Sequence, residues 1–227
     1  MEQEKETLKQ RAYRIIKERI LFCQYLPGSD LNEDMLLKDT GLSRAPIRDA
    51  LSRLEQEGLL KIIPKKGVRV SEVTLNDINT VYEMRSLIEP YNIRRHGDKI
   101  DKESLERFRR LFDDMAAPEK IQEAERENRL GRLYALDDEF HQYLISCSKN
   151  PYMERTMKLI YNQDIRLRIL TSIDRSRLQM SRPEHMEIID CLLQEQYEKA
   201  ACVMERHLEK AKQASFQEII KNGGWAK

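Results

Sequence analysis

The segment Gly41-Leu42-Ser43-Arg44-Ala45-Pro46-Ile47-Arg48-Asp49-Ala50-Leu51 decides the fold of the first third of the chain. Its glycine suits a turn after a helix, and its serine is a residue type that caps helix N-termini. Pro46 falls in the first turn of a helix predicted over residues 44–57, where a missing N–H breaks no intrahelical bond. The segment therefore predicts a turn followed by a helix, with Arg44 and Arg48 on one face.

The flanking residues extend this turn and helix into a larger pattern. Apolar residues recur at helical spacing over residues 8–23, and a short capped helix is predicted over residues 33–39. Two β-prone runs, residues 59–63 and 68–70, surround Pro64-Lys65-Lys66-Gly67, which predicts a hairpin. The order helix, helix, turn, helix, hairpin is that of a winged helix-turn-helix.

Basic residues gather in this region although the whole chain is almost neutral. Its 227 residues include 40 Lys+Arg and 39 Asp+Glu, whereas residues 41–70 contain 7 basic and 3 acidic residues. Binding of DNA phosphates needs local cations, and arginines near the start of a helix in the major groove can also bond guanine. Any one of these arginines is equally compatible with a solvated helix face, but the whole constellation favours nucleic acid. The expected DNA contacts from the third helix and the hairpin tip are Arg44, Arg48, Arg53, Lys65 and Lys66.

The remaining two thirds of the chain have few turn formers and no strand pattern. Helical patterns are predicted near residues 76–96, 105–115, 119–147, 151–170, 182–194 and 197–221. About six helices without strands predict an antiparallel all-α bundle. We therefore expect a mainly α protein with two domains, residues 1–72 and 73–227, joined by a linker near residues 71–76.

The sequence also bears on where the protein resides. The N-terminal stretch MEQEKETLKQ is charged, and no apolar run approaches the roughly 20 residues that cross a bilayer. The four cysteines, Cys23, Cys147, Cys191 and Cys202, form no CxxC pair, so reduced thiols are expected. These features predict a cytoplasmic protein that does not bind membranes.

Four side chains of the bundle form a candidate metal site. Asp137 and His141 are four residues apart on one helix, so they share a face. His185 and His207 fall on the last two helices and can meet if those helices are antiparallel. Three imidazoles and a carboxylate suit Zn²⁺, Ni²⁺, Co²⁺ or Mn²⁺. The spacing leaves a second interpretation open, because an isolated Asp-x-x-x-His is common on surfaces and a lone helical histidine is usually structural.

The first domain resembles the DNA-binding domain of GntR-family bacterial repressors. The resemblance rests on the opening segment, on Leu54-Glu55-x-Glu57-Gly58 and on Pro64-Lys65-Lys66-Gly67-Val68-x-Val70. It implies that Ser43 belongs to the DNA-binding surface and that Arg44 and Arg48 contact operator bases or phosphates. It also implies that Gly67 lets the wing approach the minor groove. Some members carry another arginine in the second helix, where this chain has Asp34.

The second domain resembles the FCD domain, the ligand-binding half of the FadR subfamily of GntR regulators, in its shorter VanR-like form. The resemblance rests on Leu136-Asp137-x-x-Phe140-His141-x-x-Leu144, on Glu184-His185-x-x-Ile188 and on His207-Leu208. It implies a metal held by Asp137, His141, His185 and His207, and an effector that is a small organic acid. Arg85 resembles the arginine that often lines the effector pocket, with Arg166 and Arg168 as further candidates. The alternative for Arg85 is an ion pair with Glu89 outside the pocket.

Together these features predict a homodimeric transcriptional regulator, by default a repressor, that binds a near-palindromic operator. Two alternatives stay open. One is a metalloenzyme, against which no general base accompanies the ligands and no Glu-x-x-His motif of di-iron bundles occurs. The other is a DNA-binding protein whose metal is purely structural.

Overall fold

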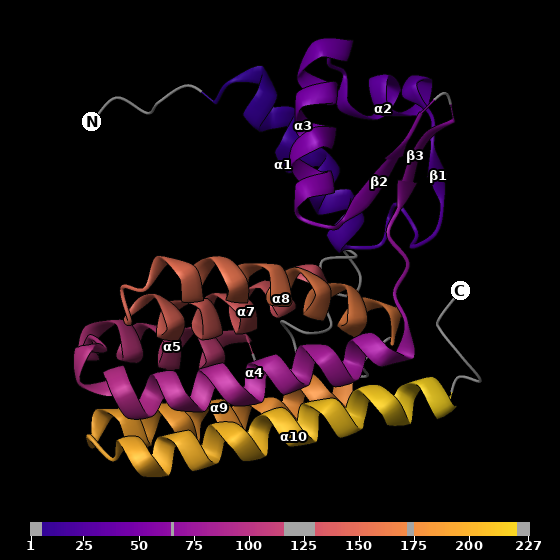
Figure 1. Ribbon diagram of the computed structural model, residues 1–227. Helices are drawn as coiled ribbons and strands as arrows, with labels where there is room; N and C mark the ends of the chain where they lie inside the picture. The colour runs from indigo at the N-terminus through magenta and orange to yellow at the C-terminus, as the bar shows by residue number, and fades with distance from the viewer. Residues whose placement is uncertain (1–5, 65, 116–129, 172–174, 222–227) are drawn as a thin grey trace. The chain divides into compact units, whose positions relative to one another are not determined.

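The computed structural model describes residues 6–64, 66–115, 130–171 and 175–221. Lys65, one of the expected DNA contacts, lies outside the described residues. The chain divides into two compact units, Met1–Thr74 and Leu75–Lys227, and Figure 1 labels the helices and strands of both.

The first unit is the predicted winged helix-turn-helix with one strand added. Its elements are α1 (Leu8–Leu21), β1 (Asp30–Leu31), α2 (Glu33–Thr40), α3 (Arg44–Gln56), β2 (Leu60–Ile63) and β3 (Gly67–Val70). The strands form an antiparallel sheet in the order β1-β3-β2. The sequence did not predict β1, because two residues are too short to display an alternating pattern.

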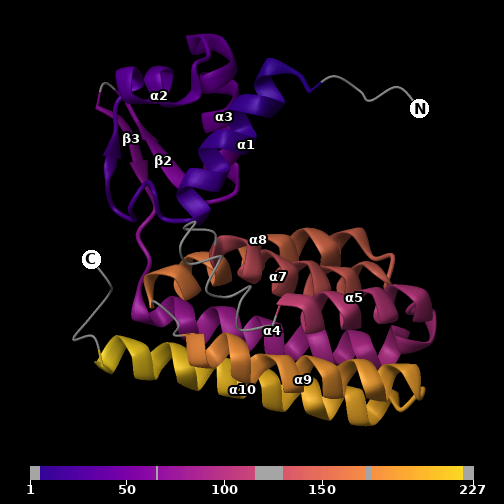
Figure 2. The same ribbon diagram turned by 180° about the vertical axis from the view of Figure 1, so that it is seen from behind.

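Local capping explains where the helices of this unit begin. Thr7 and Gln10 form a reciprocal capping box at α1, and the side chain of Asn32 accepts a bond of 2.8 Å from the Met35 N–H at α2. Ser43 occupies the N-cap position of α3, as predicted, but its side chain makes no capping bond. Helix α1 packs against α3 and α2 (Figure 2), around a core that includes Ile16, Ile20, Leu36, Ile47 and Leu54.

Gly67 is required by the wing itself. Its φ of +106° lies in a region that side chains disfavour, and an added Cβ would lie 3.0 Å from the carbonyl oxygen of Leu31 in β1. Glycine at this position therefore lets β3 pair closely with β1, whatever the wing contacts.

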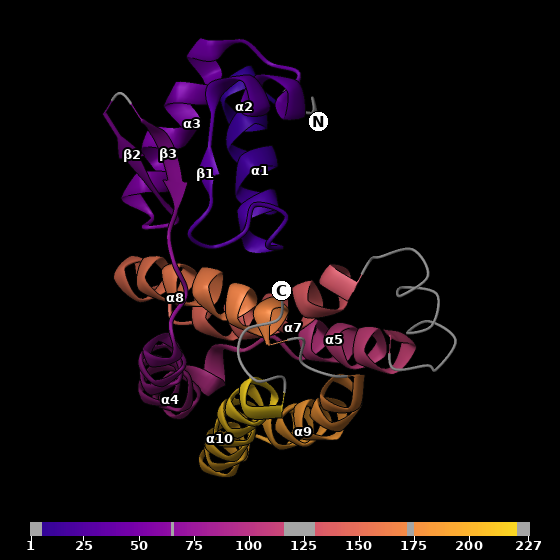
Figure 3. The same cartoon turned by 90° about the vertical axis from the view of Figure 1, so that its right-hand side faces the viewer.

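The second unit is an all-helical bundle over its described residues. Its elements are α4 (Leu75–His96), the 3₁₀ turn η1 (Gly97–Lys99), α5 (Lys102–Met115), α7 (Leu130–Ser146), α8 (Pro151–Leu170), α9 (Arg175–Leu193) and α10 (Tyr197–Lys221). Helix α4 runs antiparallel to α10 and also contacts α8 and α7 (Figures 1 and 3). Helix α5 contacts α9 and α7. The first part of the helix predicted over residues 119–147 lies outside the described residues.

One predicted helix boundary is wrong. Helix α9 begins at Arg175 rather than near residue 182, so Pro183 lies inside the helix and not in its first turn. A proline in a helix interior removes one backbone hydrogen bond. The helix continues through it because α9 packs against both α5 and α10, and tertiary packing supplies most of the stability of such a helix.

The core of this unit lies between α4, α5, α7, α9 and α10. Phe108, Phe112 and Phe140 pack edge to face at its centre, with ring centroids 5.4 and 5.5 Å apart. No helix in the described part of the chain is both long and apolar enough to span a bilayer.

Candidate metal centre and DNA-binding surface

The four candidate metal ligands come together inside the bundle. Asp137 and His141 project from α7, His185 from α9 and His207 from α10. One ligand atom from each of the four lies within 4.8 Å of the other three, and all three histidines are buried. The juxtaposition expected from the i, i+4 spacing on α7 and from the α9–α10 pair is therefore present in the fold.

Two carboxylates set the orientation of the imidazoles. His141 Nδ1 lies 2.6 Å from Glu89 Oε2, and His207 Nδ1 lies 2.8 Å from Glu184 Oε2. An ionised carboxylate only accepts hydrogen bonds, so these contacts place a proton on Nδ1 and leave Nε2 with its lone pair. His141 Nε2 in turn lies 3.4 Å from His185 Nε2. The donor set therefore fits a divalent metal such as Zn²⁺.

Burial and neighbouring charges favour the metal-binding forms of His207, His185 and Asp137. Burial lowers the pKa of His207 to about 3 and also lowers the pKa of His185. Burial alone would raise the pKa of Asp137, but Arg168 and His185 hold it well below its usual range. Neutral imidazoles and an ionised carboxylate are the forms that bind metals.

A chain of ion pairs links α4 and α8 to these ligands. Arg85 Nε lies 2.7 Å from Glu89 Oε1, and Arg85 Nη1 lies 2.7 Å from Asp164 Oδ2. The same Asp164 oxygen lies 3.1 Å from Arg168 Nε, and Arg168 Nη1 donates to Asp137 Oδ2 at 2.7 Å. We call Glu89, Arg85, Asp164, Arg168 and Asp137 the buried ion-pair chain. It begins beside one metal ligand, His141, and ends at another.

The three arginines considered as effector contacts have different surroundings. Arg85 makes the ion pair with Glu89 that was the alternative interpretation, yet it does so beside the candidate metal centre, and its Nη2 is buried without a hydrogen-bond partner. Arg168 donates from Nη1 to Asp137 and from Nη2 to Asp138, while its Nε lies 3.1 Å from Asp164 Oδ2 as an ion pair. Arg166 donates from Nη1 to Gln163, and lies on the opposite side of α8 because two residues turn a helix by about 200°.

The sequence analysis did not find Glu89, Glu184 or Asp164 as parts of the site. Glu89 was considered only as a partner of Arg85, and Glu184 only as the neighbour of His185. The i, i+4 spacings of Arg85 with Glu89 and of Asp164 with Arg168 were available signals. These spacings indicate a pair within one helix. They do not indicate that both pairs also contact α7, which carries Asp137 and His141.

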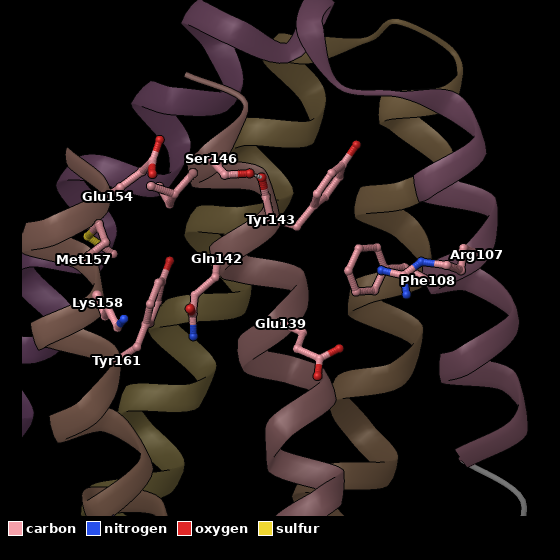
Figure 4. A pocket seen from close by; sticks show the side chains of 11 residues that line it. Arg107, Phe108, Glu139, Gln142, Tyr143, Ser146, Glu154, Met157, Lys158 and Tyr161 are labelled. Atoms are coloured by element: carbon pink, nitrogen blue, oxygen red, sulfur yellow. Dashed lines mark hydrogen bonds between the residues drawn. The ribbon is translucent and has the colours of Figure 1, made fainter. Parts of the chain in front are cut away.

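An open groove of about 460 Å³ lies between α5, α7 and α8. Figure 4 shows the side chains that line it, among them Arg107, Glu139, Tyr143, Lys158 and Tyr161. Tyr161 is buried, and its ring centroid lies 5.4 Å from the Arg85 guanidinium carbon. One side chain that lines the groove, Tyr161, therefore also contacts Arg85 of the buried ion-pair chain.

The expected DNA contacts on α3 divide into two groups. Arg44 and Arg48 are exposed, and their guanidinium nitrogens lie 3.1 and 3.8 Å from the carboxylate of Glu33 on α2. Arg53 instead stacks over the Tyr13 ring of α1, with 4.0 Å between the guanidinium carbon and the ring centroid. Lys66 is exposed at the tip of the wing. Within α3, Arg53 thus stacks on an aromatic ring, whereas Arg44 and Arg48 are exposed and lie beside a carboxylate.

The buried state of His207 predicts a pH effect on the metal-free protein. An unfolded histidine titrates near pH 6.5, whereas His207 in the fold titrates at about 3. As the pH falls from 7 to 5 the unfolded state gains a proton and the folded state does not, so this histidine removes about 2 kcal/mol from the free energy of unfolding. Urea unfolding of chelator-treated wild type and His207→Gln at both pH values measures this loss.

The comparison with His207→Gln is needed because Asp138 acts in the opposite direction. Burial raises the pKa of Asp138 to about 7, so the folded state gains a proton there as the pH falls. That contribution is common to both proteins and cancels in their difference. A difference that stays constant between pH 7 and pH 5 would contradict a neutral, buried His207.

Comparison with known proteins identifies both units. Residues 8–70 match the gntR family of bacterial regulatory proteins, and residues 80–210 match the FCD domain. The HTH-type transcriptional repressor RspR of Escherichia coli (strain K12) is 24% identical over 221 residues, which span 97% of this chain and 94% of that protein.

Solved structures share the fold. A GntR-type transcriptional regulator from Rhodococcus sp. RHA1 superposes with a TM-score of 0.72 at 20% identity, over 92% of this chain and 97% of that one. The metal-free FCD domain of the regulator TM0439 superposes with a TM-score of 0.56 at 20% identity, over 66% of this chain and 99% of that one. The chain therefore belongs to the GntR family of bacterial regulatory proteins, with the FCD architecture of the FadR subfamily, and is a DNA-binding transcriptional regulator rather than an enzyme.

Proposed function

We propose that this regulator senses a small organic acid, which binds at a divalent metal held by Asp137, His141, His185 and His207. The observation that carries the proposal is the convergence of four ligand atoms within 4.8 Å, with the Nδ1 atoms of two histidines already engaged by carboxylates. A purely structural role for these histidines would not require a ligand atom of each to lie so close to the others.

The charge balance around the centre supports a divalent cation. Three buried carboxylates, Glu89, Asp138 and Asp164, and the partly buried Asp137 surround two buried guanidiniums, Arg85 and Arg168. With neutral histidines this leaves an excess of two negative charges when all four carboxylates are ionised, and a smaller excess near pH 7, because burial raises the pKa of Asp138 to about 7. Uncompensated charge is costly in a protein interior, and a bound divalent cation neutralises it. The histidine-rich donor set suits Zn²⁺, Ni²⁺, Co²⁺ or Mn²⁺.

Arg85 is the residue that we assign to the far end of the effector. The metal supplies a Lewis-acidic position for one carboxylate of the acid. Arg85 Nη2 is a buried donor without a partner in the fold, and a leftover donor of this kind favours a ligand with a second acceptor group. Arg168 is already directed at three carboxylates, so we assign it to Asp137 rather than to the effector.

Effector binding would act on DNA through the junction of the two units. We propose a cytoplasmic homodimer in which each α3 enters one half-site of a near-palindromic operator, with Ser43, Arg44, Arg48 and the wing residues Lys65, Lys66 and Gly67 at the DNA. The effector would change the placement of the two winged units through residues 71–76, and a coupling of about 1–3 kcal/mol suffices. Repression released by the effector is the default, and RspR is itself named a repressor.

Fluorescence anisotropy on the DNA fragment upstream of the protein's own gene tests this proposal. We expect the metal-loaded protein to bind that fragment, and one member of a panel of mono- and dicarboxylic acids to change the affinity at least fivefold. Isothermal calorimetry of the same acids against the metal-loaded protein is the companion measurement. If none of the acids binds the metal-loaded protein and none changes its affinity for DNA, the sensing role is overturned. The metal would then have only a structural role.

A further inference from the structure

We infer that Asp164 is a positioning residue for the metal centre, which it reaches through two arginines and without touching any metal ligand. The inference rests on the proposed metal site. Asp164 lies on α8, is fully buried, and uses one oxygen, Oδ2, for both Arg85 and Arg168. Its other oxygen, Oδ1, is buried without a hydrogen-bond partner.

The first arm of this arrangement runs through Arg168 to Asp137. Arg168 lies one helical turn after Asp164, and its Nε faces Asp164 while its Nη1 donates to Asp137 Oδ2. This bond occupies one oxygen of the ligand carboxylate. The other oxygen, Oδ1, lies 3.1 Å from His185 Nε2, on the side of the histidines. Asp137 Oδ2 itself lies 3.9 Å from His141 Nε2, so Arg168 fixes the orientation of this carboxylate relative to both histidines.

The second arm runs through Arg85 and Glu89 to His141. Arg85 Nη1 faces Asp164 and its Nε faces Glu89 Oε1, while Glu89 Oε2 receives the Nδ1 proton of His141. Every link is between 2.6 and 2.7 Å long. The carboxylate that orients His141 is thus itself held by a guanidinium that Asp164 holds.

Asp164 is the point where the two arms meet. The metal ligands project from α7, α9 and α10. Asp164 and Arg168 lie on α8, and Arg85 and Glu89 lie on α4. Without the Asp164 charge, two buried guanidiniums would face a position with no counter-charge, and each would reorient toward its remaining carboxylates. Both a carboxylate ligand and a histidine ligand would then lose the side chain that orients them. Such outer partners typically contribute 10- to 100-fold to metal affinity.

The test is the affinity of the full-length Asp164→Asn variant for Zn²⁺, measured by competition with a chromophoric chelator. We expect binding about 10- to 100-fold weaker than wild type. We also expect a changed ligand-field absorption spectrum when Co²⁺ replaces Zn²⁺, because the orientation of two ligands changes. Met157→Ala is the matched control: Met157 is fully buried on the same helix, so its loss destabilises the fold, yet Zn²⁺ affinity and the Co²⁺ spectrum should stay as in wild type.

A double-mutant cycle with Arg168→Met separates positioning from a general loss of stability. If Asp164 acts through Arg168, the double variant binds Zn²⁺ more tightly than the product of the two single losses predicts. Should Asp164→Asn not fold, Arg168→Met alone must show the weakened Zn²⁺ binding and the altered Co²⁺ spectrum. A folded Asp164→Asn with wild-type affinity and spectrum overturns this inference and leaves the proposed function standing. Failure of the wild-type protein to bind any of the four metals overturns the proposed function itself.

Discussion

The His185→Ala variant is expected to lose metal binding, together with the stabilisation that a bound metal gives the fold. His185 is buried, stacks on Phe112 with ring centroids 4.6 Å apart, and offers Nε2 next to His141 and Asp137. Its removal takes away a donor atom and not only an orienting partner, so the affinity should fall by more than the roughly 100-fold of an outer-partner change. Zn²⁺ at a thousand times its dissociation constant should stabilise the wild type by about 4 kcal/mol.

Thermal and urea unfolding with and without Zn²⁺ measure this difference. For His185→Ala the gain on adding Zn²⁺ should fall below about 1 kcal/mol under the same conditions, because the metal no longer distinguishes the folded from the unfolded state. His96→Ala is the control, since His96 lies at the end of α4, contacts Lys99 at 3.2 Å, and is not one of the four candidate ligands. Equal Zn²⁺ stabilisation of wild type and His185→Ala would contradict the four-ligand site.

The second large effect is expected at the DNA-binding surface, where two substitutions should act in opposite directions. Arg48→Ala removes an exposed cation of α3 that no core residue holds, and should weaken operator binding roughly tenfold to a hundredfold without changing the fold. Glu33→Gln removes the carboxylate that lies beside both Arg44 and Arg48. It should strengthen binding a few-fold on operator and non-operator DNA alike, because less negative charge then faces the phosphates.

Anisotropy titrations at several salt concentrations measure both effects. The salt dependence of binding should decrease for Arg48→Ala if the arginine contacts a phosphate, and the preference for the operator should decrease if it contacts a base. Lys102→Ala, which breaks an exposed pair with Glu195 in the second unit, removes the same charge and should leave binding unchanged. Wild-type affinity of Arg48→Ala would exclude α3 as the recognition helix.

The residues that could be predicted are those whose role depends on one helix or one hairpin. The Asp137–His141 spacing, the start of a helix directly after residue 43 and the breaks around α8 are local patterns, and all reappear in the fold. Helical periodicity also identifies an inward face for each element. The positions of α3 and the wing followed from such signals alone, and so did the helical character of the second unit.

Relations between helices could not be predicted in the same way. His141 and Glu89 are 52 residues apart, and no spacing rule states that α4 presents Glu89 to α7. Arg53 was assigned to the DNA-binding face because it is polar, and no local pattern predicted that the Tyr13 ring of α1 lies under its exposed guanidinium. The start of α9 was misjudged because Pro183 is a local signal, while the packing that carries the helix through it is not local.

The sequence by itself therefore determined the order of the elements, the two family resemblances and the identity of four potential metal ligands. The order of the elements and the Asp137–His141 pair follow from local backbone preferences and residue spacing, whereas the full ligand set was what the family resemblance implied. Only the tertiary structure decided that Glu89 and Glu184 orient two histidines, that Arg168 faces Asp137, and that Asp164 joins both arginines. The physical reason is that periodicity specifies which face of a helix is buried, whereas the partner of a buried charge depends on the rotation and depth at which helices pack against one another.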